Sequence, residues 1–149
     1  MSAALEDLYQ QLIIDHSRRP RNFRALEAPD RRLEGFNPLC GDQVTVYVKL
    51  EGDRIREAAF QGSGCAISTA SASLMTESVR GKSLEEVERL FQAFHALVTG
   101  KGAGREVELG KLAAFEGVAS YPARVKCATL PWHALRAALA GSGQSVTTE

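Results

Sequence analysis

Apolar and polar residues alternate strictly in the middle of the chain. Over residues 44–50, valine and leucine occupy every second position, and threonine, tyrosine and lysine fall between them. This pattern is typical of a strand with one buried face. A glycine-containing turn at residues 51–54 follows, so residues 55–61 are expected to return as the second strand of a hairpin. Residues 32–36 predict a third strand at the edge of the sheet.

Other segments repeat their apolar residues at helical spacing. Residues 3–16 predict a first helix. Ser83 and Glu86 have the spacing of a capping box, so a helix is expected from there to about Val98. Further helices are expected over residues 66–80, 109–116 and 123–140.

A hairpin followed by a run of helices predicts an α+β fold, with a small antiparallel three-stranded sheet and helices packed on it. The length of 149 residues is that of one domain. We place this domain at residues 1–140. Residues 141–149 are mostly polar and small, and they are expected to form a disordered tail.

The charge balance narrows the function classes. Eighteen Lys and Arg face eighteen Asp and Glu, so the formal net charge is zero. A general nucleic-acid binder needs a basic surplus and is therefore disfavoured. No apolar run reaches the ~20 residues of a bilayer span, and no signal peptide is recognised, so we expect a cytoplasmic protein without a membrane partner. The arginine-rich segment 18–32 is either a solvated coil or a docking patch for an acidic partner.

The three cysteines are the main candidates for chemistry. An odd number cannot pair completely in disulfides, so in a reducing compartment they serve as packing residues, as a nucleophile or as metal ligands. Cys40 and Asp42 enter the predicted hairpin and Cys65 leaves it. Because the two ends of an antiparallel pair are neighbours, these side chains are expected at the same end of the sheet.

The local surroundings of the cysteines favour thiolates. Cys65 stands at the start of a predicted helix, where free N–H groups and the helix dipole stabilise negative charge. Cys127 has Arg124 and Lys126 within three residues. Three thiolates and a carboxylate suit a tetrahedral divalent metal site that can open, although packing remains an alternative. The remaining candidate ligands lie in or beside predicted helices and are interpreted as structural: His16, His95 and His133.

Several motifs resemble those of the U-type iron–sulfur cluster assembly proteins, the family of IscU, SufU and the NifU N-terminal domain. They follow in order over about residues 5–140: Asp15-His16, Pro20-Arg21-Asn22, Asn37-Pro38-Leu39-Cys40-Gly41-Asp42, Phe60 to Cys65 with small residues to Ser73, Gly81-Lys82-Ser83-Leu84 and Lys126-Cys127-Ala128. The segment from Arg124 to Trp132 is similar to the SufU branch. Lys126 stands where the IscU branch has a histidine.

The resemblance implies an IscU/SufU-like fold with zinc held by Cys40, Asp42, Cys65 and Cys127. A pyridoxal-phosphate cysteine desulfurase, similar to SufS or IscS, would deliver sulfane sulfur to Cys40. That thiolate is freed when a histidine of the desulfurase replaces it on zinc. Arg124 would be an auxiliary residue that holds a departing thiolate or carboxylate. The chain would then be a sulfurtransferase-like partner of the desulfurase rather than a stand-alone enzyme.

Two other functions stay open at this point. Cysteine thiolates also bind iron–sulfur clusters, so the same ligands suit a scaffold that assembles a [2Fe–2S] cluster and passes it to apo-proteins. The third interpretation is a purely structural zinc module. Structural zinc sites usually have four Cys or His ligands, so a carboxylate ligand from Asp42 disfavours this interpretation.

Overall fold

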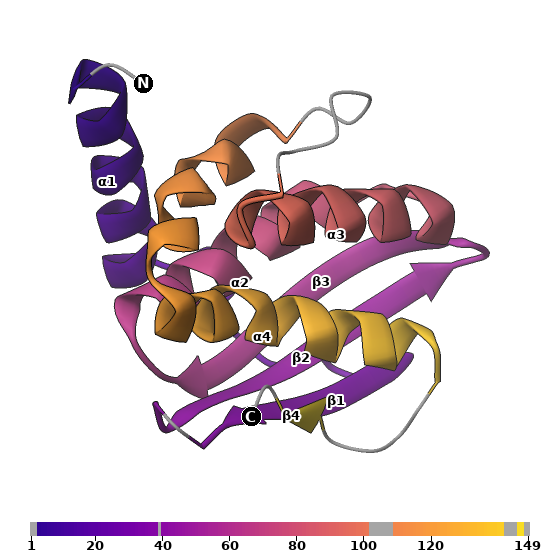
Figure 1. Cartoon of the computed structure of the whole chain (residues 1–149). Coiled ribbons are helices and arrows are strands. Elements are labelled where there is room, and N and C mark those ends of the chain that lie inside the picture. The colour runs from indigo at the N-terminus through magenta and orange to yellow at the C-terminus, as the bar shows by residue number, and fades with distance from the viewer. Residues whose placement is uncertain (1–2, 39, 102–108, 142–145, 148–149) are drawn as a thin grey trace.

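The computed structural model describes residues 3–38, 40–101, 109–141 and 146–147. Its elements are, in chain order, α1 (Ala3–Arg18), β1 (Arg31–Asn37), β2 (Asp42–Glu51), β3 (Arg54–Ser63), α2 (Ala66–Val79), α3 (Leu84–Val98), the 3₁₀-helix η1 (Gly110–Ser120), α4 (Pro122–Leu139) and β4 (Val146–Thr147). The helices gather on one face of a twisted sheet, with α1 at the end of this layer (Figure 1). Among the described residues, no helix combines the length and apolar character that a bilayer span requires.

The sheet confirms the predicted α+β class but corrects the predicted number and direction of strands. It has four strands in the order β3-β2-β1-β4. The three predicted strands pair antiparallel, whereas β4 pairs in parallel with β1, with Gly35 opposite Val146. Gly35 allows this approach, because a Cβ there would lie 3.3 Å from Cγ2 of Val146. A strand of two residues is too short to produce an alternating pattern, so the sequence gives no signal for β4.

The new strand lies inside the segment that the sequence predicts as a tail. Within residues 141–149, the structure describes Gly141 and the two residues of β4. Residues 142–145 and 148–149 lie outside the described residues. The division into one domain and a disordered tail therefore stays a prediction.

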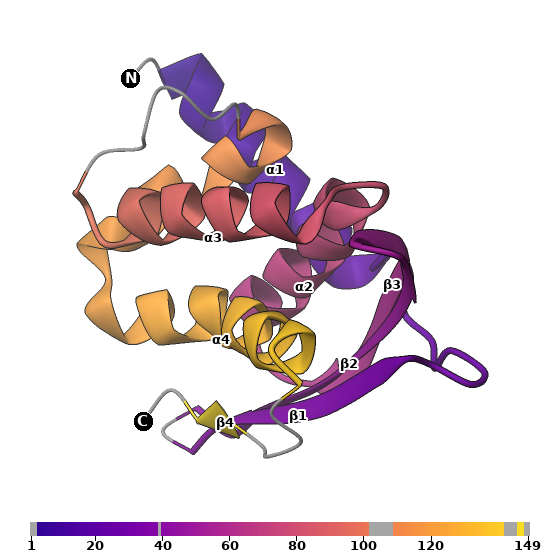
Figure 2. The same cartoon turned by 90° about the vertical axis from the view of Figure 1, so that its right-hand side faces the viewer.

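The central strand β2 is buried on both faces, although its alternation predicts only one buried face. The valines of β2 belong to the main core below the helices. On the other face, Tyr47 packs with Leu26 and Ala59 in a second, smaller cluster. Leu26 comes from the segment between α1 and β1, which crosses this face of the sheet (Figure 2).

Backbone hydrogen bonds attach this crossing segment to β3. The N–H of Arg24 donates to the carbonyl of Phe60 at 2.9 Å, and the N–H of Phe60 donates to the carbonyl of Asn22 at 3.0 Å. Phe23, between these two residues, meets the ring of Phe60 edge-on at 5.1 Å. Residues 22–24 therefore pair with the outer edge of β3, and the segment beyond them places Leu26 on the second face of the sheet.

Aromatic side chains form the centre of the helical layer. Phe94 of α3 is fully buried and stacks on Trp132 of α4 with ring centroids 4.9 Å apart. Phe115 of η1 meets the Phe94 ring edge-on, with ring centroids 5.6 Å apart. The predicted capping box at the start of α3 is confirmed: Ser83 Oγ accepts the Glu86 N–H at 3.1 Å, and Glu86 Oε1 accepts the Ser83 N–H at 2.9 Å.

The short helix predicted over residues 109–116 is the 3₁₀-helix η1, and it extends to Ser120. Its most buried large side chains repeat every three residues: Leu112, Phe115 and Val118. In a 3₁₀-helix residues three apart lie directly above one another, so this spacing presents all three side chains to the core.

A buried polar network attaches α1 to α2. His16 is 1% exposed, and its Nδ1 lies 2.7 Å from Oγ of Ser73. The hydroxyl oxygen of Ser73 accepts the backbone N–H of Arg21 at 2.8 Å, which leaves its own proton to donate to the imidazole. Both hydrogen bonds of the Ser73 hydroxyl can therefore form when His16 is neutral and its Nδ1 accepts the proton. Burial above all, and then the charge of Arg21, lowers the pKa of His16 below its ordinary value.

This lowered pKa predicts a loss of stability in mild acid. The unfolded chain takes up a proton at His16 below about pH 6.5, where the folded protein still disfavours the charged imidazole. The free energy of unfolding is therefore expected to fall as the pH is lowered through this range. In His16→Asn, whose amide oxygen can accept from Ser73 but does not titrate, the fall should be smaller. Urea unfolding of the chelator-treated proteins between pH 8 and 5.5 measures both slopes, and equal slopes would contradict the prediction.

Candidate metal and sulfur site

The β2–β3 hairpin brings the first predicted site residues to one end of the sheet. Asp42 is the first residue of β2, Cys40 lies just before it, and Cys65 follows the end of β3. Gln43 pairs with Ser63 in the register of the two strands, so the entrance of β2 and the exit of β3 are neighbours as predicted. Cys40 is exposed, Cys65 is partly buried and Asp42 is buried.

The start of α2 fixes the carboxylate of Asp42. Its Oδ1 accepts the backbone N–H of Cys65 at 2.9 Å, and its Oδ2 lies 3.9 Å from Sγ of Cys65. Cys65 is also the N-cap of α2, where its sulfur accepts the N–H of Ser68 at 3.4 Å. Gly64 is required here, because a Cβ at this position would lie 2.6 Å from Oδ1 of Asp42.

Helix α4 brings the third cysteine to the same corner. Cys127 is fully buried, and its Sγ lies 3.4 Å from Sγ of Cys40. Burial above all, and then hydrogen bonding with Asp42 and the other two cysteines, raises the pKa of the Cys127 thiol far above its ordinary value. The sequence places the cations Arg124 and Lys126 near this thiol, whereas burial in the fold acts against its thiolate form. A coordinated divalent cation would reverse the balance and deprotonate the thiol.

The donor atoms of this corner fit a soft or borderline divalent metal. Sγ of Cys40, a carboxylate oxygen of Asp42 and Sγ of Cys127 all lie within 4.8 Å of one another. Tetrahedral zinc with bonds of ~2.3 Å holds two thiolates ~3.8 Å apart, which is near the spacing of the two sulfurs here. Sulfur donors select zinc or iron over magnesium or calcium. Cys65 is not part of this close set, but it contacts the set through Asp42.

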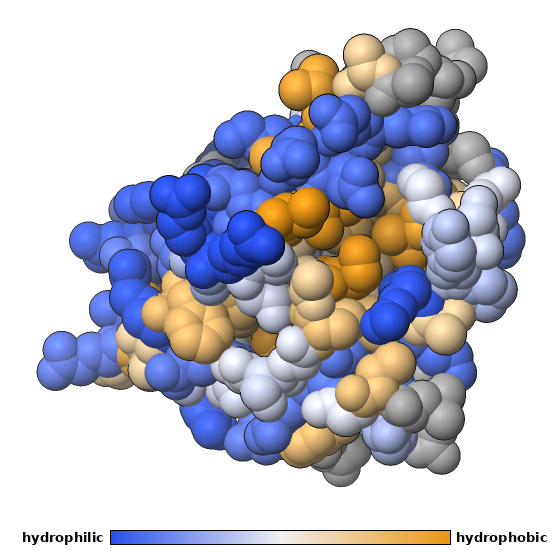
Figure 3. All heavy atoms as spheres, turned by 90° about the vertical axis from the view of Figure 1, so that its left-hand side faces the viewer, coloured by the Kyte–Doolittle hydropathy of each residue, from blue (hydrophilic) through white to orange (hydrophobic). Residues whose placement is uncertain are grey.

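Arg124 is an exposed cation beside the sulfurs, at the start of α4. Hydrogen bonding with Cys127, and then the charge of Cys65, raises the pKa of Arg124 above its ordinary value. The same residue lines a cavity of about 410 Å³ between α1, α2, η1 and α4. This cavity is lined largely by apolar groups, among them Ile13, Ile67 and Val118. Figure 3 shows this side of the molecule, where hydrophilic side chains border an apolar hollow.

Asn37 is a site neighbour that the sequence reasoning did not single out. It ends β1, is fully buried, and donates from Nδ2 to Sγ of Cys127 at 3.8 Å. Its Oδ1 has no hydrogen-bond partner in the described part of the chain. Leu33, Gly35 and Asn37 alternate on the inner face of β1. A polar residue at such an inward position needs a partner, and this is the signal that identifies Asn37.

The histidines lie away from this corner. His16 contacts Ser73 between α1 and α2. His95 of α3 and His133 of α4 face each other with ring centroids 6.2 Å apart. Among the described residues, the only group of three or more closely spaced metal-binding side chains is that of Cys40, Asp42 and Cys127.

Comparison with known proteins gives a consistent set of relatives. Residues 8–128 match the family model of the NifU-like N-terminal domain. The chain is 41% identical over 139 residues to the zinc-dependent sulfurtransferase SufU of Bacillus subtilis (strain 168), covering 93% of this chain and 94% of that protein. It is 41% identical over 141 residues to the iron–sulfur cluster assembly scaffold protein IscU of Streptococcus pyogenes serotype M1, covering 95% and 88%. The crystal structure of the N-terminal part of a nitrogen-fixing NifU-like protein from Brucella abortus aligns with a TM-score of 0.82 at 26% identity, covering 91% and 94%.

Proposed function

Because the chain belongs to the family of NifU-like N-terminal domains, we propose that it acts in iron–sulfur cluster biosynthesis as a zinc-dependent acceptor and carrier of sulfane sulfur. One observation carries the proposal: the exposed thiol of Cys40 lies 3.4 Å from the buried thiol of Cys127. The site thus combines a sulfur that a partner can reach with sulfur and oxygen donors that the fold holds in place. A purely structural site would not need an exposed ligand.

Cys40, Asp42, Cys65 and Cys127 are the residues that would hold zinc. When bound, the ion would keep the thiols deprotonated without adding redox chemistry of its own. Burial raises the pKa of the Cys127 thiol, and a bound cation would act against that shift and favour the thiolate. The donor set of the described residues and the name of the Bacillus relative both support zinc.

The transfer itself needs a thiolate at Cys40 and a persulfide on the donor protein. The Cys40 sulfur attacks the outer sulfur of the persulfide, a new S–S bond forms on Cys40, and the old S–S bond breaks. The donor cysteine leaves as a thiolate, so the step needs no external oxidant or reductant. Arg124 lies beside Cys127 and Cys65 and supplies positive charge to the sulfurs during this exchange.

Partners of this protein belong to the cluster-assembly machinery, as the names of its relatives indicate. Within that machinery, a cysteine desulfurase is the donor that fits, because its product is a protein-bound persulfide. Apo-proteins or later assembly proteins would receive the sulfur. The cytoplasmic location expected from the sequence stays a prediction.

Sulfur acceptance by Cys40 tests the proposal. With L-cysteine and the cognate desulfurase, the wild-type protein should raise the rate of alanine release at least about tenfold, and Cys40→Ser should leave it at the basal rate. Mass spectrometry of the wild-type protein should find the added sulfur on Cys40, with Cys65 and Cys127 as internal controls in the same chain. A Cys40→Ser protein that still accepts sulfur would overturn the proposal.

A cluster scaffold is the second candidate, and the IscU relative, named as a scaffold, favours it. A cluster scaffold would use the same ligands as the zinc-dependent sulfur acceptor, since thiolates bind iron–sulfur clusters as well as zinc. Metal analysis of protein purified without oxygen separates the two functions. Zinc alone supports the sulfur acceptor, whereas iron together with acid-labile sulfide supports the scaffold.

A further inference from the structure

Asn37 is tied to every member of the donor set formed by Cys40, Asp42 and Cys127. It is the last residue of β1 and stands opposite Asp42 in the register of β1 and β2. Its carbonyl accepts the backbone N–H of Cys40 at 3.2 Å. Its side-chain Nδ2 donates to Sγ of Cys127 at 3.8 Å. One residue of β1 thus links the loop, the strand and the helix that supply these donors.

Packing alone does not explain the side chain of Asn37. It is fully buried, and its Oδ1 has no hydrogen-bond partner in the described part of the chain. Burying an unpaired polar atom destabilises a fold, and an apolar side chain would avoid this loss. The N–H directed at the sulfur of Cys127 is the contact that an amide makes and an apolar side chain does not.

Three of the four predicted metal ligands accept a hydrogen bond from an N–H group of the fold. Oδ1 of Asp42 accepts the backbone N–H of Cys65 at 2.9 Å, and Sγ of Cys65 accepts the N–H of Ser68 at 3.4 Å. Sγ of Cys127 accepts the side-chain N–H of Asn37. Such bonds stabilise negative charge on the acceptor and fix its direction, and they strengthen metal binding in this way.

Cys40 is the exception among these ligands. Its thiol is exposed, and its sulfur accepts no N–H from the residues that the structure describes; the neighbour of this sulfur is Sγ of Cys127 at 3.4 Å. A thiolate whose charge is stabilised is a weaker nucleophile. The pattern of donors therefore leaves Cys40 as the most reactive of the three thiolates.

We infer that Asn37 is a positioning residue for the proposed sulfur transfer. Its N–H keeps the sulfur of Cys127 in place as a ligand, while Cys40, which lacks such a donor, is the thiolate that accepts sulfur. The inference rests on the proposed function, because it takes Cys127 as a metal ligand. Arg124 is hydrogen-bonded with Cys127 as well, but its side chain is exposed, so the buried Asn37 is the fixed donor.

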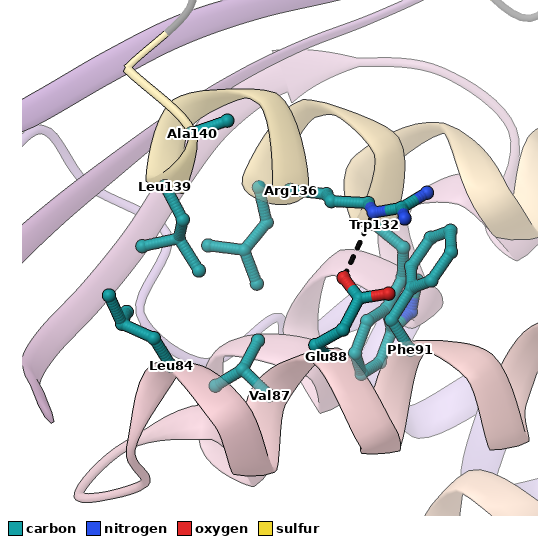
Figure 4. Close-up of a pocket in the computed structure, with 9 residues that line it drawn as sticks. Leu84, Val87, Glu88, Phe91, Trp132, Arg136, Leu139 and Ala140 are labelled. Carbon is teal, nitrogen blue, oxygen red and sulfur yellow. Dashed lines mark hydrogen bonds and ion pairs between the residues drawn. The ribbon is translucent and has the colours of Figure 1, made fainter. Parts of the chain in front are cut away.

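Helix α4 has contacts that hold it in place without Asn37. Nε of Arg136 bonds Oε1 of Glu88 in α3 at 2.9 Å, and Trp132 of α4 and Phe91 of α3 line the same hollow between the two helices (Figure 4). A substitution of Asn37 is therefore expected to change the surroundings of the sulfur while α4 stays packed on α3.

Cobalt(II) in place of zinc tests the role of Asn37. The near-ultraviolet charge-transfer band of the cobalt protein reports the negative charge on its thiolate ligands. Asn37→Asp keeps the shape of the side chain and replaces the N–H donor by a carboxylate. The band should therefore move to longer wavelength, and the zinc dissociation constant should rise about tenfold. Asn37→Leu has neither donor nor charge, and its band should move in the same direction.

Asn22→Asp is the matched control for this substitution. Nδ2 of Asn22 donates to Oγ1 of Thr76 at 3.0 Å, outside the sulfur-containing donor set. The backbone of Asn22 has a φ of 60°, a conformation that aspartate also adopts. The control should keep the band and the zinc affinity of the wild-type protein. An equal change in the control would overturn the role of Asn37.

NMR of the wild-type protein loaded with an NMR-active cadmium isotope gives a second readout that needs no variant to fold. The side-chain amide protons of Asn37 should show a scalar coupling to the metal across the N–H···S bond, and absence of this coupling would overturn the inference.

These measurements separate the inference from the proposed function. A wild-type cobalt protein without a thiolate charge-transfer band overturns the metal site, and the inference with it. A wild-type band that stays unchanged in both Asn37 variants overturns the inference alone.

Discussion

Cys127→Ser is expected to lose at least about nine-tenths of the zinc bound by the wild-type protein. The serine hydroxyl has almost the size of the thiol, but it stays protonated at neutral pH and is a weak zinc ligand. Cys127 is fully buried, so no water or neighbouring side chain can easily take its place. Metal analysis after purification, together with competition against a coloured zinc chelator, measures the loss.

Thr129→Ser on the same helix is the matched control for this substitution. The Thr129 hydroxyl donates to the carbonyl of Val125 at 2.9 Å and lies outside the sulfur-containing donor set. This control should keep its zinc. If Cys127→Ser also keeps a full complement of zinc at unchanged affinity, Cys127 is a packing residue and the proposed ligand set is wrong.

Phe94→Ala is expected to lower the free energy of unfolding by about 3–5 kcal/mol. The Phe94 ring is fully buried between Trp132 of α4 and Phe115 of η1. Its removal leaves a cavity where three helices meet, and rigid aromatic neighbours cannot close it without a shift of their helices. Most single domains of this size have only about 5–15 kcal/mol of stability, so the variant should be close to unfolding at 37 °C.

Urea unfolding at a fixed zinc concentration measures this loss. Phe23→Ala is the matched control, because Phe23 also meets another aromatic ring edge-on but is 45% exposed. Its removal should cost about 1 kcal/mol, since less area is buried and water can fill the space. A loss below about 1 kcal/mol in Phe94→Ala would mean that the three helices do not share one rigid core.

The two halves of the site differ in the support that holds them. Cys65 and Asp42 are tied by a backbone hydrogen bond at the start of α2, and Gly64 leaves room for it. Cys127 depends on how α4 packs on the sheet. Cys40 lies on the exposed loop between β1 and β2. The arrangement keeps the donors in place while one thiol stays accessible to another protein.

Local patterns predict the elements of the fold well. The alternation in β2, the turn after it and the capping box at Ser83 each depend on neighbouring residues, and the structure contains all of them. The strand β4 has no such signal, since a parallel pair of two residues depends on contact with β1. The 3₁₀ form of η1 depends on the core that Leu112, Phe115 and Val118 meet.

By itself, the sequence predicted the α-helices and the three antiparallel strands, and it placed Cys40, Asp42 and Cys65 at the same end of the sheet, because one hairpin brings its two ends together. Only the tertiary structure decided that Cys127 lies beside Cys40 and that burial raises the pKa of the Cys127 thiol. It also decided that Leu26, from the segment before β1, packs against Tyr47. The physical reason is desolvation. Whether a group is shielded from water depends on segments far away in the chain, and no pattern of neighbouring residues records that shielding.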